Sequence, residues 1–345
     1  MTQLERLQKT GIRRLRTSGR GFRFAAAKDS KISREDLARI HALRIPPAWT
    51  DVVINASPGG LLQAVGQDAA GRWQYLYHAN HIARAERKKF DRLVKFAEAL
   101  PNMRKTVARE LRKPGLGRER VMACILRVLS TCLIRPGSQV YASENGSYGL
   151  ATLRPKHVSV KGDLVSFDFK GKSQVQQHQE LKDRQVAKVV RDLLKQPARE
   201  VFKYQNGDGE FVDVKRRHIN DYIKEVMGES FTAKDFRTWA GTLVCACALA
   251  RTGIDLADTK TSKKQRIVAA IKETAETLGN TPAVCRSAYI CPAILVNFER
   301  GKTIERYFNT AEQLVNYRAT RLHEAERALL RLLKQNNYGL SRASL

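Results

Sequence analysis

The chain has 345 residues, with 62 Lys and Arg against 34 Asp and Glu, so its formal net charge is +28. This length suggests two domains, and a hydrophobic content of 43% is enough for packed cores, which excludes a wholly disordered chain. No stretch approaches the ~18 apolar residues of a membrane helix, and the first ten residues lack the apolar core of a secretion signal.

The first 88 residues favour a small β-rich domain. Residues 1–30 hold eight basic and two acidic groups, which predicts a partly ordered basic arm that either contacts phosphates or is only solvated. Residues 33–44 predict a helix with Ser33 as its N-cap, ended by the prolines that follow. Three β-like runs come next, at 49–54, 61–65 and 73–78. We therefore expect a small antiparallel sheet with a helix or two.

The remaining residues, 89–345, favour a larger and mainly helical domain. Helical periodicity marks 90–99, 118–134, 185–194, 218–226 and 263–278, and a long amphipathic helix is predicted over 304–334 with its apolar stripe at Leu314, Leu322, Leu329, Leu330 and Leu333. Short strands at 158–160, 164–170 and 175–181, joined by tight turns, predict one small antiparallel sheet. The fold class is therefore α+β.

The positive charge is spread over both predicted domains. Residues 1–88 carry 16 basic and 7 acidic groups, and the remainder carries 46 and 27. Anionic membranes, RNA and DNA could each attract such a protein. A polyanion held between two basic bodies fits this distribution, and double-stranded DNA suits it well. A protein that merely coats nucleic acid would have a similar charge, so the magnitude alone does not specify a function.

Several common sites are not expected. The six cysteines form no C-x-x-C pair, so we expect reduced thiols in a cytoplasmic protein and no zinc site. Gly301-Lys302-Thr303 resembles the end of a phosphate-binding loop, but Val296 stands where that loop needs its first glycine. We expect no nucleotide cofactor, no acidic cluster suited to Mg²⁺ and no metal. No separate assembly segment is apparent, so a monomer is expected.

Five short segments stand out by their order and spacing. Ile45-Pro46-Pro47-Ala48-Trp49 is followed by Arg72-x-x-Tyr75-x-Tyr77. The others are Leu133-Ile134-Arg135-Pro136-Gly137 leading to Tyr141 and residues 144–150, the hairpin tip Gly171-Lys172, the run Lys234-Asp235-Phe236-Arg237-Thr238-Trp239, and Leu278-Gly279-Asn280-Thr281-Pro282 with Tyr289 nine residues after Asn280.

Together these segments resemble the type IB DNA topoisomerases of the compact bacterial and poxvirus kind, over roughly residues 33–300. The resemblance implies a small β-rich amino-terminal domain and a larger helical catalytic domain, like that of tyrosine recombinases, which close around duplex DNA. It implies strand nicking through a 3′-phosphotyrosyl link, swivelling and religation, with relaxation of both supercoil signs and without ATP or metal. By motif match, the catalytic residues are Arg135, Lys172, Arg237, Asn280 and Tyr289. Such an enzyme would be associated with the nucleoid.

These residue types suit the chemistry. The transition state of phosphodiester cleavage gathers negative charge on the phosphate oxygens, and two arginines can donate to these oxygens in pairs. The 5′-oxygen leaves poorly without a proton, and Lys172 could supply one as a general acid; Lys170 is a nearby rival. Tyr289 would be the nucleophile, activated by positive charge because an ordinary phenol ionises only near pH ~10.

Asn280 departs from the commonest family pattern, which has histidine at this place. An asparagine can donate a hydrogen bond to a phosphate oxygen but does not titrate near neutral pH. We therefore expect it to act by hydrogen bonding. The residue follows Gly279, so a role in ending a helix remains an alternative.

The resemblance also implies residues that bind DNA without taking part in the chemistry. Arg72, Tyr75 and Tyr77 match contacts of the small domain, and Tyr141 and Lys234 match contacts of the larger one. Tyr75 and Tyr77 alternate along a strand, so both can point to one side. An aromatic pair that covers a core is the alternative for these two residues.

Two other functions compete with this hypothesis. A tyrosine recombinase shares the catalytic residues, but it usually has H-x-x-R at the second arginine, where this chain has Lys234-Asp235-Phe236-Arg237. Recombinases also begin with a helical domain, whereas this amino-terminal half favours strands. A non-enzymatic DNA-binding protein of the nucleoid would explain the charge but not the ordered segments.

Overall fold

A computed structural model describes residues 1–19, 21–26, 31–197, 199–254, 259–311, 313, 317 and 319–339, with the backbone alone at 83, 86, 87, 89 and 336–339. The chain divides into two compact units, Met1–Lys89 and Phe90–Leu345. The fold is α+β, as predicted. No helix of the described residues is long and apolar enough to span a membrane.

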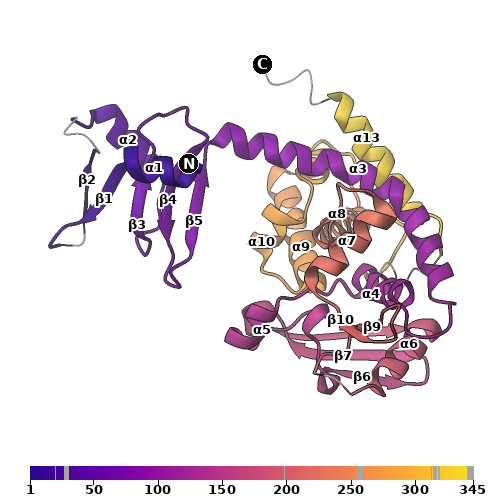
Figure 1. The fold of residues 1–345 in the computed structure, drawn as a ribbon. Helices are drawn as coiled ribbons and strands as arrows, with labels where there is room; N and C mark the ends of the chain where they lie inside the picture. The colour runs from indigo at the N-terminus through magenta and orange to yellow at the C-terminus, as the bar shows by residue number, and fades with distance from the viewer. Residues whose placement is uncertain are drawn as a thin grey trace. The chain divides into compact units, whose positions relative to one another are not determined.

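The first unit is a five-stranded antiparallel sheet with two helices (Figure 1). The strand order is β2-β1-β3-β4-β5. The elements are α1 (Gln3–Thr10), β1 (Ile12–Arg16), β2 (Phe22–Ala25), α2 (Arg34–Ala42), β3 (Thr50–Ile54), β4 (Leu62–Gln67) and β5 (Trp73–Tyr77). The predicted helix and three strands are confirmed, and the hydroxyl of Ser33 accepts the backbone N–H of Asp36 as expected of an N-cap.

The prediction of a basic arm over residues 1–30 is wrong for 3–16 and 22–25. These residues form a helix and two strands, and Ile12 is buried opposite Ile54. The arginines lie among apolar residues in a pattern that allows strand pairing. The guanidinium of Arg14 also serves the fold, because it donates to the carbonyl oxygens of Ile45, Pro46 and Trp49. Residues 20 and 27–30 lie outside the described residues.

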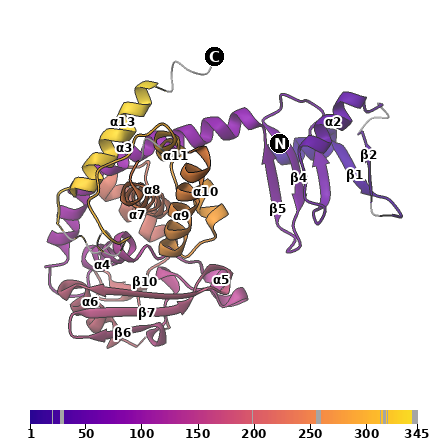
Figure 2. The ribbon, with the colours of Figure 1, turned by 180° about the vertical axis from the view of Figure 1, so that it is seen from behind.

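The second unit contains the predicted helices and small sheet (Figure 2). The three-stranded antiparallel sheet has the order β6-β7-β8. The first elements of the second unit are α3 (Ala79–Glu110, which belongs to this unit from Phe90 on), α4 (Arg118–Cys132), α5 (Gln139–Asn145), β6 (Val158–Lys161), β7 (Leu164–Lys170) and β8 (Gln176–Lys182). The later elements are α6 (Arg184–Leu194), β9 (Lys203–Gln205), β10 (Phe211–Asp213), α7 (Arg216–Met227), α8 (Ala233–Thr252), α9 (Lys260–Leu278), α10 (Pro282–Ala288), α11 (Pro292–Glu299) and α13 (Glu324–Gly339).

The predicted helix over 304–334 is wrong in its first part. The helix α13 begins at Glu324, and residues 302–308 run without helix or strand while Ile304 and Phe308 are buried. The carboxylate of Glu326 accepts the backbone N–H of His323, which satisfies a free donor at the start of the helix. Leu314 lies outside the described residues.

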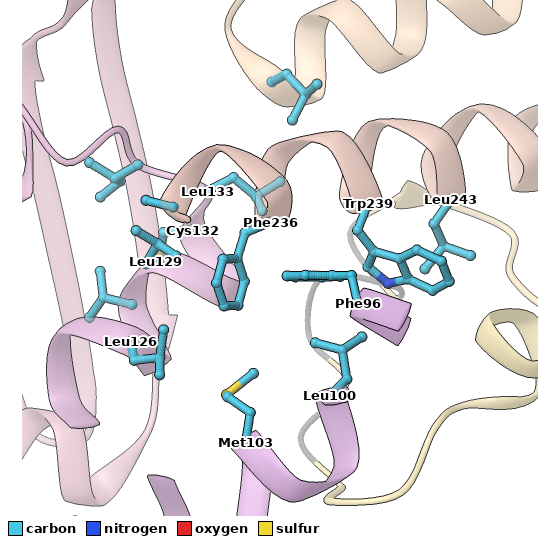
Figure 3. Packing of buried hydrophobic residues seen from close by; sticks show 14 of the residues in the cluster. Phe96, Leu100, Met103, Leu126, Leu129, Cys132, Leu133, Phe236, Trp239 and Leu243 are labelled. Carbon is cyan, nitrogen blue, oxygen red and sulfur yellow. The ribbon is translucent and has the colours of Figure 1, made fainter. Parts of the chain in front are cut away.

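The core of the second unit is built around α8. Figure 3 shows Phe96 and Leu100 of α3 facing Phe236 and Trp239 of α8. The ring of Phe96 meets that of Phe236 edge to face, with centroids 4.9 Å apart, a favourable arrangement for two aromatic side chains. α8 also packs against α9, α11 and α13. This central helix is therefore held on several sides, and it carries Lys234 and Arg237 of the candidate site.

Candidate active site

The structure brings four of the five predicted catalytic residues together in the second unit. Arg135 follows α4, Arg237 lies in the second turn of α8, Asn280 follows α9, and Tyr289 ends α10. Side-chain contacts join Arg135 to Asn280 and Arg237 to Tyr289. The positive charge of Arg135 also acts on both Arg237 and Tyr289. Residues from distant parts of the sequence thus form one cluster.

Arg237 is the most buried member of this cluster, with an exposed fraction of 5%. Its two terminal nitrogens donate to the backbone carbonyl oxygens of Leu133 and Leu278, the latter at 2.6 Å. Burial, and then the nearby charge of Arg135, lower the pKa of Arg237 to about 10, so it stays protonated at neutral pH. Its Nε is buried without a hydrogen-bond partner among the described residues. The two backbone contacts fix the orientation of the guanidinium group.

Sequence reasoning did not find the two residues that hold Arg237. Leu133 and Leu278 act through backbone carbonyl groups, which any residue type has, so the side-chain pattern contains no signal for them. Leu133 caps α4 in the left-handed backbone conformation (φ 55°), which costs a non-glycine residue about 1–2 kcal/mol. This turn aims the Leu133 carbonyl at Arg237 and begins the loop that carries Arg135.

The loop around Arg135 is held by backbone pairing. The backbone N–H of Leu150 donates to the carbonyl oxygen of Arg135 at 2.9 Å, and that of Ala151 donates to Pro136 at 2.8 Å. Gly149 makes this approach possible, because a Cβ atom there would lie only 2.5 Å from the Arg135 carbonyl oxygen. Gly149 of the segment 144–150 therefore has a structural reason.

Asn280 helps to end a helix, which was the alternative weighed for it, and its side chain also belongs to the cluster. Its backbone N–H donates to the carbonyl oxygen of Ala275 at 2.9 Å, just after the left-handed C-cap Gly279, and so helps to end α9. Its side-chain oxygen accepts a hydrogen bond from Arg135. The amide nitrogen Nδ2 is buried and has no hydrogen-bond partner among the described residues. This nitrogen is a donor available to a ligand.

Tyr289 is half-buried, and the guanidinium carbon of Arg237 lies 5.2 Å from the centre of its ring. Burial by itself would raise the pKa of Tyr289. The charge of Arg237 and a hydrogen bond from it, together with the charges of Arg135 and Lys234, outweigh burial, so the pKa is lowered from its ordinary value. A phenol in this setting ionises more readily than one in water, which suits a nucleophile.

Lys172 stands apart from these four residues in the described contacts. It is exposed and lies in a short turn, Lys172–Gln174, between β7 and β8. Ser173 and Gln174 both have positive φ, near 61°. The side chain of Gln174 bonds to the carbonyl oxygen of Asn145 and to the Ser147 hydroxyl, the latter at 3.3 Å, and so ties the turn to the end of α5. Lys170, the rival general acid, is also exposed.

The residues predicted to bind DNA are all exposed. Tyr75 and Tyr77 of β5 are about 42% and 40% exposed, and their rings stack with centroids 6.4 Å apart. The guanidinium of Arg72 pairs with Asp68 at 3.1 Å. Tyr141 of α5 is 48% exposed, and Lys234 is exposed in the first turn of α8. The stacked tyrosine pair faces outward and does not cover a core.

Other kinds of site are not found in the part of the chain that the structure describes. There, no group of three or more His, Cys, Asp and Glu side chains is arranged to hold a metal ion. The six cysteines are buried, and burial raises the pKa of Cys245 and Cys247 to about 12. These thiols are therefore protonated at neutral pH.

Two family models and several known proteins are similar to this chain. The family described as "Eukaryotic DNA topoisomerase I, catalytic core" matches residues 78–314, and the family "Bacterial DNA topoisomerase IB, N-terminal domain" matches residues 21–68. The DNA topoisomerase 1B of Acanthamoeba polyphaga mimivirus is 32% identical over 89% of this chain and 90% of its own length. The DNA topoisomerase 1B of vaccinia virus (strain Copenhagen) is 26% identical over 73% and 79%.

This chain belongs to the type IB DNA topoisomerase family. It is therefore an isomerase that acts on DNA.

Proposed function

We propose that the protein relaxes positive and negative supercoils by cutting one strand of duplex DNA through a covalent bond to Tyr289. The Tyr289 oxygen attacks the phosphorus atom, the bond from phosphorus to the 5′-oxygen breaks, and a 3′-phosphotyrosyl link remains. The phenol proton passes to water, and Lys172 gives a proton to the leaving 5′-oxygen. After the free strand has swivelled, the 5′-hydroxyl attacks the link, returns its proton to Lys172 and releases Tyr289.

One observation supports this proposal above the others. Two buried donors, Nε of Arg237 and Nδ2 of Asn280, lack hydrogen-bond partners among the described residues, and both residues belong to the cluster around Tyr289. Buried donors are normally paired, so an unpaired set suggests a ligand that supplies acceptors. A phosphate that reacts with Tyr289 has such acceptors in its non-bridging oxygens.

The charges of the site suit a reaction without a metal ion. Arg237 is held rigidly by two carbonyl groups and remains charged, and Arg135 adds a second cation. Fixed donors of this kind stabilise the extra charge of a transition state without reorganising. The phosphotyrosyl bond retains the energy of the cut strand, so we propose that religation needs no ATP.

DNA binding is proposed for the exposed residues of both units. The stacked rings of Tyr75 and Tyr77 offer flat apolar faces and two hydroxyl groups, and the exposed Arg72 lies just before the same strand, β5. In the second unit, the exposed ring of Tyr141 offers an apolar face, and the exposed ammonium group of Lys234 offers a positive charge. The net charge of +28 supplies attraction to phosphates along the duplex.

The test is relaxation of a supercoiled plasmid in EDTA and without ATP, for wild type, Tyr289→Phe and a control, Tyr307→Phe. We expect relaxation and a denaturant-stable protein–DNA complex with wild type and Tyr307→Phe, and neither with Tyr289→Phe. On a labelled linear duplex, the strand on the 3′ side of the break should be released without protein, because the protein is joined to the 3′-phosphate on the other side of the break. Relaxation by Tyr289→Phe, or an absolute need for Mg²⁺ or ATP, would overturn the proposal. Exchange of strands between two specific duplexes would instead indicate a recombinase.

A further inference from the structure

Thr242 of α8 contacts the backbone of the proposed nucleophile and of the turn just after it. Its side chain is fully buried, with an exposed fraction of 0%. Its hydroxyl accepts the backbone N–H of Cys291 at 3.1 Å and lies 3.2 Å from the carbonyl oxygen of Tyr289. One side chain thus bridges the turn from Tyr289 to Cys291, between α10 and α11.

The bond to Cys291 distinguishes Thr242 from other helical threonines. The Thr242 hydroxyl also lies 2.8 Å from the carbonyl oxygen of Thr238, one turn earlier, and Thr274 makes the same kind of bond to Ala270 at 2.7 Å. Such a bond is the usual way to satisfy a buried threonine in a helix. The bond that the Thr242 hydroxyl accepts from the Cys291 N–H is a separate contact, because it joins two different segments of the chain. It gives a buried backbone donor a partner.

Gly241, the residue before Thr242, lets α8 lie directly against the nucleophile. A Cβ atom at Gly241 would lie 3.0 Å from the carbonyl oxygen and 3.1 Å from the Cβ of Tyr289. Both distances are tighter than ordinary van der Waals contact. The backbone of α8 therefore touches the backbone of Tyr289, while Arg237, one turn earlier in α8, lies beside the Tyr289 ring.

We propose that Thr242 is a positioning residue for Tyr289. Its hydroxyl ties the turn after α10 to α8, and Gly241 sets how closely the two segments approach. Together they hold the phenol beside Arg237 and in line for attack. The residue is fully buried, so it acts through Tyr289 and not through contact with DNA. This inference rests on the proposed role of Tyr289 as the nucleophile.

Positioning predicts a specific pattern of effects. Thr242→Val keeps the shape of the side chain but removes the hydroxyl, whereas Thr242→Ser keeps the hydroxyl. A displacement of ~1 Å in a reacting group can slow a reaction by about 10²-fold. We expect Thr242→Val to slow single-turnover cleavage of a labelled duplex by roughly 10-fold to 10²-fold, with unchanged DNA affinity, and Thr242→Ser to restore most of the rate.

A control separates positioning from stability. Thr274→Val removes an equally buried hydroxyl, in α9, that bonds to the carbonyl oxygen of Ala270 in its own helix and interacts with the Cys245 thiol of α8. Neither partner belongs to the turn that follows Tyr289. Its thermal unfolding should shift about as much as that of Thr242→Val, but its cleavage rate should stay near that of wild type. The phenol of Tyr289, titrated by its ultraviolet absorbance against Tyr289→Phe, should ionise at higher pH in Thr242→Val, because the ring moves away from Arg237.

Several results would overturn the inference. One is cleavage by Thr242→Val at nearly the wild-type rate, and another is an equal loss in Thr274→Val. If Thr242→Val does not fold, Gly241→Ala is the second test. Alanine favours the helix, but its methyl group would press on Tyr289 and displace it. Cleavage by Gly241→Ala at the wild-type rate would then contradict the inference. Cleavage by Tyr289→Phe in the same assay would show instead that the proposed function itself is wrong.

Discussion

The guanidinium carbon of Arg237 lies 5.2 Å from the centre of the Tyr289 ring, and the two residues meet in a largely buried setting. A buried charge is screened less than an exposed one, so its effect on a neighbouring phenol is large. This pair links the pKa of the proposed nucleophile to a residue that a different helix provides. It also explains why a tyrosine in a partly buried place, which should ionise late, ionises early.

The first prediction concerns this titration. The difference in ultraviolet absorbance between wild type and Tyr289→Phe should show a phenol with a pKa below the ordinary value. In Arg237→Leu, burial outweighs the remaining charges, so the pKa should rise; in Arg237→Lys, which keeps a positive charge, the rise should be smaller. Cleavage by wild type should increase with pH and level off as the phenol becomes ionised. A Tyr289 pKa that does not respond to Arg237→Leu would contradict the relationship.

The second prediction concerns the amide of Asn280. Asn280→Ala removes the unpaired donor Nδ2 and the acceptor of Arg135, so single-turnover cleavage should fall by on the order of 10²-fold to 10³-fold, as for one lost donor to a transition state. Asn280→Asp should be at least as slow, because it also adds negative charge beside the phosphate. Thr281→Ser, at the neighbouring exposed N-cap of α10, is the control. A loss below threefold in Asn280→Ala would remove this residue from the site.

The third prediction separates Lys172 from Lys170. A 5′-thiolate leaves without a proton, whereas a 5′-alkoxide needs one. Lys172→Ala should therefore cleave an ordinary duplex slowly and regain much of its rate on a duplex with sulfur at the bridging 5′ position. Lys170→Ala should cleave both duplexes at similar relative rates. The opposite pattern would assign the general acid to Lys170, and no rescue in either variant would mean that neither lysine donates the proton.

The fourth prediction concerns an ion pair that anchors the last helix. Arg104 of α3 bonds to both carboxylate oxygens of Glu326, at 2.8 and 2.9 Å, and Glu326 is only 3% exposed. Arg104→Met would leave a buried carboxylate without its main partner, so the free energy of unfolding should fall by about 3–5 kcal/mol. Removing both charges in Arg104→Met/Glu326→Met should cost less than the single change. The urea-induced unfolding transition of the second unit measures the free energy of unfolding of the single and the double variant. Equal losses in the two variants would argue against a buried pair.

The fifth prediction concerns salt. If many phosphates are neutralised by the basic surface, the logarithm of DNA affinity should fall steeply and linearly with the logarithm of salt concentration. Tyr75→Ser removes an aromatic face but no charge, so affinity should fall without a change in slope. Lys234→Gln should reduce the slope by about one unit. A flat response of the wild type to moderate salt would contradict extensive phosphate contact.

Much of the secondary structure could be predicted because it depends on local patterns. The alternation in 73–78 and the turns around 162 and 171 predict strands that the structure contains, and Ser33 caps its helix as its residue type suggests. The errors have local causes as well. The density of arginine near residues 12–16 hid a strand, and leucine spacing extended the last helix backwards over residues that pack without helical structure. In the first case the basic composition was followed although the apolar residues of 12–16 allow a strand. In the second case the leucine spacing was followed although no capping box stands at residue 304.

The sequence by itself determined the residue types of the candidate site, their order and their spacing, because chemistry requires particular side chains and the family pattern keeps them at fixed intervals. Only the tertiary structure decided that Arg237 donates to the carbonyl groups of Leu133 and Leu278, and that Thr242 bridges the turn after Tyr289. The sequence does show the pair Gly241-Thr242 inside an apolar run, but nothing local says what it faces. Contacts through the backbone and across distant segments depend on how helices pack, and that packing follows from burial of the whole core and not from any one segment.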